Sequence, residues 1–270
     1  MIHEGGIYME PLIFSQVKET MYRLNRAAHA DYSKLNYHMS HLEYVYKYTI
    51  KISRKLGIPV DTNKWAYISY GHDLLKEHGL DPNKHVTWKG IEIPQDPNRY
   101  VRMNLDVLEE YKVEEYFNSD MQYHALASAI FMVKEMHIIS PEIIYPIMFH
   151  SCPIMDIYNT LPKHLQTSID ITMLADKLSS NWLRINLLDK EVCCDLDLAV
   201  FGESGREFNY TLGLYLARLI SQGKSDGGQS KITTEYYYDR LCMTNPLIKK
   251  KPELGGKQQW PKRNQPLQTQ

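Results

Sequence analysis

The sequence predicts an all-α fold, and three observations support this prediction. Apolar residues recur at spacings of three and four in several segments, which is typical of helices with one buried face. Residues that start and stop helices flank these segments, for example Asp61 before one segment and Gly57 after another. The chain of 270 residues, of which 43% are hydrophobic, can build one large domain or one domain with appendages.

The first predicted helix, Ile13 to His29, belongs to a lead-in that covers residues 1–36. Its apolar stripe consists of Val17, Met21 and Leu24. We expect surface or capping roles for His29, at the end of this helix, and for His38, which follows it. Residues 37–185 form the predicted helical core.

The second predicted helix runs from His41 to Leu56. Its apolar residues recur at spacings of three and four and place His41 on the buried face, near Val45. Gly57, with Pro59 after it, ends the helix.

The third predicted helix begins after the capping residues Asp61-Thr62-Asn63. The apolar spacing of three and four continues up to His72, which therefore belongs to the buried stripe. Asp73 lies about 100° farther round the helix. Lys76 lies about one turn beyond His72, and its long side chain can reach the same pocket.

Residues 79–119 interrupt the helical pattern with turn signals such as Asp81-Pro82-Asn83 and Asp96-Pro97-Asn98. We predict an irregular insertion there, with a short helix from Leu105 to Phe117. Because the insertion follows His72 and Asp73 directly, it is either a lid over a site or a simple surface excursion.

Three further helices are predicted after the insertion. Ser119-Asp120 caps the first, which carries His124 in its first turns. The second begins at Ser140-Pro141-Glu142 and ends at His150. The third, Leu165 to Leu178, carries Asp176 on an inward face. A buried carboxylate is costly unless a cation pairs with it, so either a metal ion or a Lys or Arg side chain should lie beside Asp176.

The C-terminal part is less informative. Residues 186–248 form a predicted helical extension with one helix from Asn209 to Ser221, and residues 249–270 are predicted to be disordered. The net charge of -1 argues against a stable nucleic-acid partner. We find no signal peptide and no apolar run that approaches a membrane span.

The cysteines indicate a reducing compartment, because none of them forms a C-x-x-C pair. We expect free thiols at Cys152, Cys193, Cys194 and Cys242. The sequence therefore predicts a cytoplasmic protein without a membrane partner.

Four imidazoles and two carboxylates lie near the inward faces or the ends of the predicted helices. They are His41, His72, Asp73, His124, His150 and Asp176. This set of donors suits two ions of iron, manganese or a similar metal, with Asp73 between them. Two close metal ions can deprotonate a bridging water and hold phosphate oxygens during in-line attack. The alternative is a structural helical protein in which these groups are hydrogen-bonded core residues.

The order of these residues resembles the HD-domain superfamily of metal-dependent phosphohydrolases. His41-Leu42-Glu43-Tyr44-Val45 is similar to the H-x-x-x-V motif of this superfamily, and His72-Asp73-Leu74-Leu75-Lys76 is similar to H-D-x-x-K. His124, His150 and Ala175-Asp176-Lys177-Leu178 follow in order. Over residues 37–181 the chain is most similar to the bacterial family that cleaves diadenosine tetraphosphate symmetrically into two ADP.

This resemblance implies an HD-domain helical bundle with an insertion and a C-terminal extension. It also implies a binuclear divalent metal centre, with iron as the first choice and manganese, magnesium, cobalt or nickel as alternatives. Asp73 and Lys76 are the expected catalytic residues, with Lys76 and Arg184 in contact with the phosphates of a small nucleotide. Trp88 or Tyr100 is expected to stack on a base. Whether the chain forms a homodimer stays open.

The chain departs from that family in two places that border the substrate. Ser151-Cys152-Pro153 stands where the family has Thr-Thr-Gly, and residues 179–184 replace a Pro-Gly-Arg turn. The exact nucleotide therefore stays open, and a nucleotidase or a deoxynucleotide triphosphohydrolase is the alternative enzyme. The alternative of another class is a protein that binds nucleotides without turnover, against which the intact set of six ligands argues.

Overall fold

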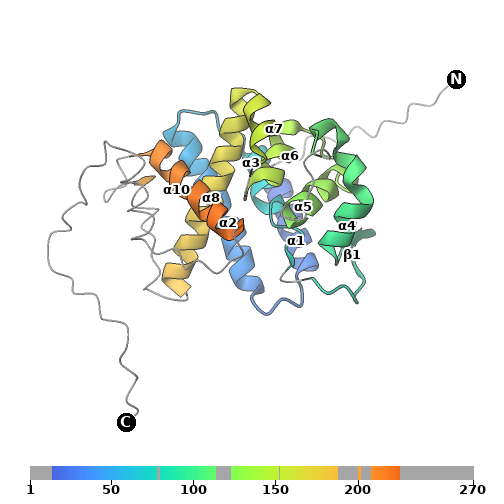
Figure 1. Cartoon of the computed structure of the whole chain (residues 1–270). Helices are drawn as coiled ribbons and strands as arrows, with labels where there is room; N and C mark the ends of the chain where they lie inside the picture. The colour runs from blue at the N-terminus through green and yellow to red at the C-terminus, as the bar shows by residue number, and fades with distance from the viewer. Residues whose placement is uncertain are drawn as a thin grey trace, which may run out of the picture. The chain divides into compact units, whose positions relative to one another are not determined.

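The computed structural model describes residues 14–77, 80–113, 123–151, 153–187, 200–201 and 208–225, without the side chains of residues 14–15, 181–187 and 219–225. The chain divides into two compact units, Met1–Lys231 and Ile232–Gln270, and every described residue belongs to the first. In this part the fold is all-α, as predicted, with one small two-stranded sheet (Figure 1). The predicted tail and all four cysteines lie outside the described residues.

Helices α2 (Leu35–Lys55) and α8 (Lys163–Leu187) pack side by side (Figure 1). Both bury one apolar face, with Leu42 and Ile52 on α2 and Ile169 on α8 among the residues without exposed surface. α2 begins at Leu35, before the predicted start at His41. No side chain caps this end, so the sequence carries no signal from which the start could be predicted. Gly57 ends α2 with a φ of +67°, as predicted.

Helices α1 (Phe14–Ala28) and α3 (Thr62–Gly71) pack against each other, so the predicted lead-in helix is part of the core. The carboxylate of Asp61 accepts a hydrogen bond from the backbone N–H of Lys64 at 2.9 Å, which confirms the predicted cap. α3 ends just before His72. The backbone N–H of His72 still donates to the Ile68 carbonyl at 2.9 Å, so His72 keeps the helical direction.

The insertion is more regular than predicted. Strands β1 (Val86–Trp88) and β2 (Ile91–Ile93) form an antiparallel hairpin. Its two turn residues, Lys89 and Gly90, have φ values of +51° and +83°, which is the geometry of a tight two-residue hairpin turn. The prediction of irregular structure was wrong here because such short strands leave little alternation in the sequence.

The helix predicted from Leu105 to Phe117 is also placed differently. Helix α4 (Pro97–Asn104) comes first, and Asp96 caps it by accepting from the N–H of Arg99 at 2.9 Å. A 3-10 helix (Leu105–Tyr111) follows, and residues from 114 onward in this segment lie outside the described part. Ile93, Val101, Leu108 and Tyr111 join the hydrophobic core. The insertion is therefore no simple surface excursion.

Helices α5 (Tyr123–Lys134), α6 (Pro141–Phe149) and α7 (Met155–Thr160) follow, and α6 packs against α3, α5 and α8. Pro141 stands at the first position of α6, as predicted. α8 is longer at both ends than the predicted helix. None of the helices in the described residues is long and apolar enough to cross a membrane.

Helix α10 (Tyr210–Ser225) lies where the C-terminal extension was predicted to be helical, and it packs on α8. The buried carboxylate of Asp170 joins the two helices and α7. It accepts hydrogen bonds from Tyr158 at 2.9 Å, from Tyr210 at 3.2 Å and from Arg218 at 2.9 Å. A Cβ atom on Gly213 would lie 2.1 Å from a Val200 methyl, so only glycine allows this close approach.

Candidate metal centre

The fold brings together all six predicted metal ligands, which we call the His–Asp cluster. His41 comes from α2, His72 and Asp73 directly follow α3, His124 starts α5, His150 ends α6 and Asp176 comes from α8. Five of the six residues are buried, and His124 is partly exposed. Segments far apart in the sequence thus meet at one place in the helical core.

One side of the cluster contains His41, His72 and one oxygen of Asp73. His41 Nε2 lies 3.3 Å from His72 Nε2 and 3.5 Å from Asp73 Oδ2. Asp176 Oδ1 lies 3.2 Å from His41 Nε2 and 3.9 Å from His72 Nε2. Metal–ligand bonds of about 2.1 Å place neighbouring donor atoms about 3.0 to 3.4 Å apart. The distances from His41 Nε2 to His72 and Asp176 fall in this range and that to Asp73 is slightly longer, so His41, His72 and Asp73 can hold a common ion.

The other side contains His124, His150 and the second oxygen of Asp73. Asp73 Oδ1 lies 3.4 Å from His124 Nε2 and 3.5 Å from His150 Nε2. The two imidazole nitrogens are 3.3 Å apart. Each carboxylate oxygen of Asp73 thus faces a different group of ligands, and each group can hold one metal ion. Asp73 belongs to both groups.

Backbone carbonyls orient two of the imidazoles. His72 and His150 each donate Nδ1–H to the carbonyl three residues earlier, at 2.8 Å in both cases. When these rings are neutral, each Nε2 has a free lone pair that faces the cluster. A hydrogen bond that fixes the tautomer in this way is typical of metal-binding histidines.

Ser179 orients His41 by a different route. The hydroxyl of Ser179 donates to the His41 carbonyl at 3.0 Å, so its oxygen accepts from His41 Nδ1–H, also at 3.0 Å. His41 therefore presents Nε2 to the cluster, like the other two rings. Ser179 was not among the predicted site residues, because a serine in a helix carries no signal of its partner on another helix.

The electrostatics of the cluster favour a positive charge beside its carboxylates. Burial raises the pKa of Asp73, but the charge of Lys76 and the neighbouring imidazoles outweigh it and hold this pKa well below the ordinary value. Burial lowers the pKa of His41, but hydrogen bonds to Asp176 and Asp73 raise it overall. The two acids thus favour positive charge at His41, and a metal ion bound there would supply that charge in place of a proton.

Two of the other imidazoles, those of His72 and His124, can act as neutral metal ligands. Burial lowers the pKa of His72 to about 3 and that of His124 well below its ordinary value. Asp73 Oδ1 is buried and accepts no hydrogen bond from the described residues. An unsatisfied buried acceptor costs about 1–3 kcal/mol, and a metal ion at this place would remove that cost.

Two lysines flank the carboxylates. Lys76 donates to Asp73 Oδ2, and Lys177, which is buried, donates to Asp176 Oδ2. The alternative prediction for Asp176, a lysine partner, is therefore confirmed, while its other oxygen still faces His41 and His72. Charge from Lys177 also lowers the pKa of Asp176, although burial opposes this.

Helix α1 holds the turn that carries His72 and Asp73. Asn25 Nδ2 donates to the Tyr70 carbonyl at 2.7 Å, and His29 Nε2–H donates to the Leu74 carbonyl at 2.9 Å. These two carbonyls lie on either side of the His72-Asp73 pair. α1 therefore braces the ligand turn from outside the cluster.

The predicted surface or capping roles of His29 and His38 were wrong. Both side chains are buried, with 1% and 4% exposure, and their ring centroids lie 4.4 Å apart. Burial lowers the pKa of each. His38 becomes a core residue because α2 starts earlier than predicted and places it on the inward face.

We predict that His29→Leu weakens metal binding by about 10- to 100-fold, as is common when the support of a ligand is lost. His29→Gln should retain most of the affinity, because its amide nitrogen can replace the Nε2 donor to Leu74. The measurement is the rise in Tm on adding Mn²⁺ to metal-free protein. Tyr111→Phe, which loses a 2.7 Å bond to the Ile139 carbonyl, is the control. An unchanged rise in Tm for His29→Leu would show that α1 only adds stability.

Of the three other predicted contacts, two lie outside the cluster and the third falls on a side chain that is not described. The backbone of Arg184 belongs to α8, but its side chain lies outside the described part. Trp88 and Tyr100 are partly buried and pack against the hydrophobic core. Lys89 Nζ lies 4.7 Å from the ring centroid of Trp88. Neither ring belongs to the cluster.

Comparisons of the chain with family models, with curated proteins and with solved structures gave no match. The function of the chain is therefore inferred from its sequence and the geometry of its residues.

Proposed function

We propose that this protein is a metal-dependent phosphohydrolase that cleaves a phosphoanhydride bond of a nucleotide. The observation that carries the proposal is the position of Asp73, whose two oxygens face two separate groups of imidazoles. A carboxylate in this place suits two divalent ions. The sequence resemblance to HD-domain enzymes supports the same chemistry and makes diadenosine tetraphosphate the first substrate to test.

In this proposal, His41, His72 and Asp73 hold one ion, and Asp73, His124 and His150 hold the other. Asp176 is available as a further ligand of the first ion. Bound divalent ions supply a lower pKa for a bound water and positive charge for phosphate oxygens.

Hydrogen bonds within the chain orient the imidazoles, and burial keeps bulk water away from the carboxylates. The side chains of Asp73 and His72 have 0% exposure, whereas Lys76 has 29% and His124 has 16%. A phosphate should therefore approach from the side of Lys76 and His124. Lys76 donates a hydrogen bond to Asp73. Its ammonium group therefore lies where it can contact a phosphate oxygen of the substrate as well as the Asp73 carboxylate.

The test is elemental analysis of the purified protein together with a substrate panel. The panel contains diadenosine tetraphosphate, ribonucleoside and deoxynucleoside triphosphates, nucleoside monophosphates, and cyclic dinucleotides. Two metal ions per chain and hydrolysis of a member of the panel support the proposal. Hydrolysis of monophosphates or deoxynucleoside triphosphates alone would favour the alternative enzymes. Nucleotide binding in the presence of metal but without product would favour a protein that binds nucleotides without turnover. Absence of bound metal would favour a structural helical protein in which the six residues are hydrogen-bonded core residues.

Replacing Lys76 should affect the substrate more than the metals. We expect Lys76→Met to raise KM about tenfold or more, because a charge-assisted bond to phosphate is lost. Lys76→Arg should retain much of this contact. The measurements are KM, kcat and metal content of both variants. A normal KM for Lys76→Met would exclude the proposed phosphate contact, and loss of metal from this variant would show that Lys76 mainly holds Asp73.

A further inference from the structure

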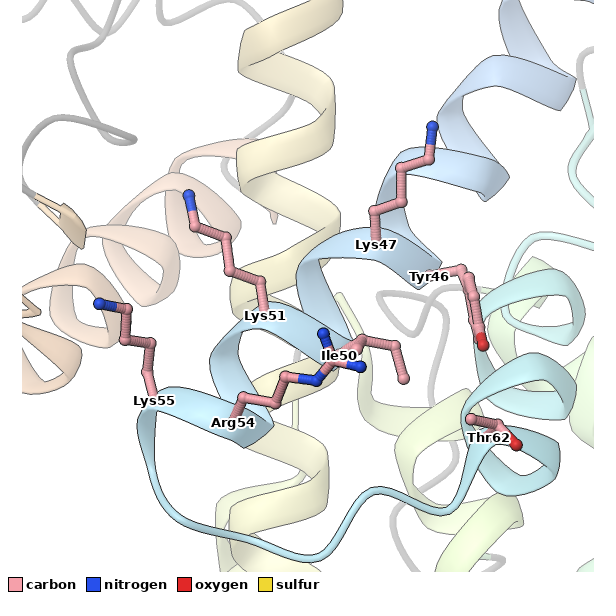
Figure 2. A pocket seen from close by; sticks show the side chains of 7 residues that line it. All are labelled: Tyr46, Lys47, Ile50, Lys51, Arg54, Lys55 and Thr62. Carbon is pink, nitrogen blue, oxygen red and sulfur yellow. The ribbon is translucent and has the colours of Figure 1, made fainter. Parts of the chain in front are cut away.

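A pocket on α2 shares no lining residue with the His–Asp cluster. It has a volume of about 680 Å³ and also includes Thr62, at the start of α3 (Figure 2). Small-molecule sites commonly have volumes of about 300 to 1,000 Å³. The pocket is therefore large enough for a ligand of the size of a nucleotide.

The pocket is positively charged. Four cations line it, namely Lys47, Lys51, Arg54 and Lys55. No carboxylate is among its lining residues, and residues 44–60 contain neither Asp nor Glu. In a chain with a net charge of -1, this is a local excess of positive charge, which attracts an anion.

The helix dipole accounts for only part of this charge. Arg54 and Lys55 lie in the last turn of α2, where cations stabilise the helix end. Lys47 and Lys51 lie earlier, beyond the reach of that effect. Figure 2 shows the three lysines following one another along α2, while Arg54 turns toward Ile50.

The contacts of Lys51 and Lys47 do not neutralise their charges. Lys51 Nζ lies 3.6 Å from the centroid of the Phe201 ring, a contact that holds the ammonium group without neutralising it. Lys47 Nζ lies 3.8 Å from Glu43 Oε1, and this ion pair is solvent-exposed and therefore weak.

Tyr46 and Ile50 also line the pocket, and Figure 2 shows Ile50 beside the guanidinium group of Arg54. An aromatic ring next to several cations suits a ligand that combines a flat base with phosphates. We propose that this pocket binds a nucleoside polyphosphate, with the phosphates on the cations and the base against Tyr46 and Ile50. The site is separate from the proposed hydrolytic centre and does not depend on it.

The test is calorimetric titration of the full-length chain carrying Asp73→Asn, which lacks a complete metal centre, with ATP and with inorganic tripolyphosphate. If that variant fails to fold, chelator-treated protein replaces it. We expect one ATP per chain and tighter binding of ATP than of tripolyphosphate. Arg54→Gln should weaken ATP binding about tenfold or more, and Arg54→Lys should weaken it less.

The matched control is Lys84→Gln, which removes a surface lysine that pairs with Asp31 outside the pocket and should leave ATP binding unchanged. Tyr46→Ser should weaken ATP about tenfold and leave tripolyphosphate unchanged. Absence of ATP binding, or equal losses in Arg54→Gln and Lys84→Gln, would overturn the site. Equal binding of tripolyphosphate and ATP would overturn the base contact.

Discussion

Asp73→Asn is expected to remove both metal ions and to reduce turnover by about 1,000-fold or more. Loss of a residue that only supports a metal ligand commonly costs about 10- to 100-fold in affinity or activity, and loss of a shared ligand should cost more. The amide keeps the size of the side chain, but it removes the negative charge and replaces one of the two facing oxygens by a donor. The measurements are elemental analysis and the rate on the substrate found in the panel.

The matched control is Asp170→Asn, a second buried aspartate of the same core. Asp170 bonds Tyr158, Tyr210 and Arg218, so this variant should lose stability but keep its metals. His41→Ala and His150→Ala separate the two groups of ligands, and each should lower the metal content by one ion. Two ions retained in Asp73→Asn would rule out the bridging position of this carboxylate.

Metal removal is expected to lower Tm by about 10 to 20 °C and to abolish turnover. Each ion present at 100 times its Kd stabilises the folded chain by about 2.7 kcal/mol. In a chain of this size, each kcal/mol changes Tm by about 2–4 °C. The carboxylates of the His–Asp cluster would also lose the positive charge that reduces their mutual repulsion. The measurement is thermal unfolding before and after dialysis against a chelator.

Restoring the metals one at a time should identify the natural ion. Iron is the first choice, and manganese, magnesium, cobalt and nickel are the alternatives. The Asp73→Asn variant is the control, because a chelator should leave its Tm unchanged. Full activity and an unchanged Tm of the wild-type protein after chelator treatment would exclude a metal-dependent enzyme.

Several helix boundaries were predictable because their signals are local. Asp61 caps α3, Gly57 ends α2 and Pro141 starts α6, and each acts within a few residues of its own position. The hairpin of the insertion was missed because its strands, Val86–Trp88 and Ile91–Ile93, are too short to show alternation.

The six cluster residues could be found from the sequence because they lie near the inward faces or the ends of predicted helices and follow the order of the HD-domain motifs. Their partners could not be found in this way. Ser179 and His29 are ordinary residues until the fold places them beside His41 and the Leu74 carbonyl. Lys177 lies next to Asp176 in the sequence, but its burial depends on helices packed around α8.

The sequence by itself determined most of the core helices, their apolar faces and the polar groups that those faces carry. Periodicity and capping are properties of neighbouring residues, so they need no knowledge of the rest of the chain. Only the tertiary structure decided that Asp73 lies between two groups of imidazoles and that four cations line one pocket. The first arrangement depends on how helices distant in the sequence pack together. The second depends on the directions of side chains along one helix.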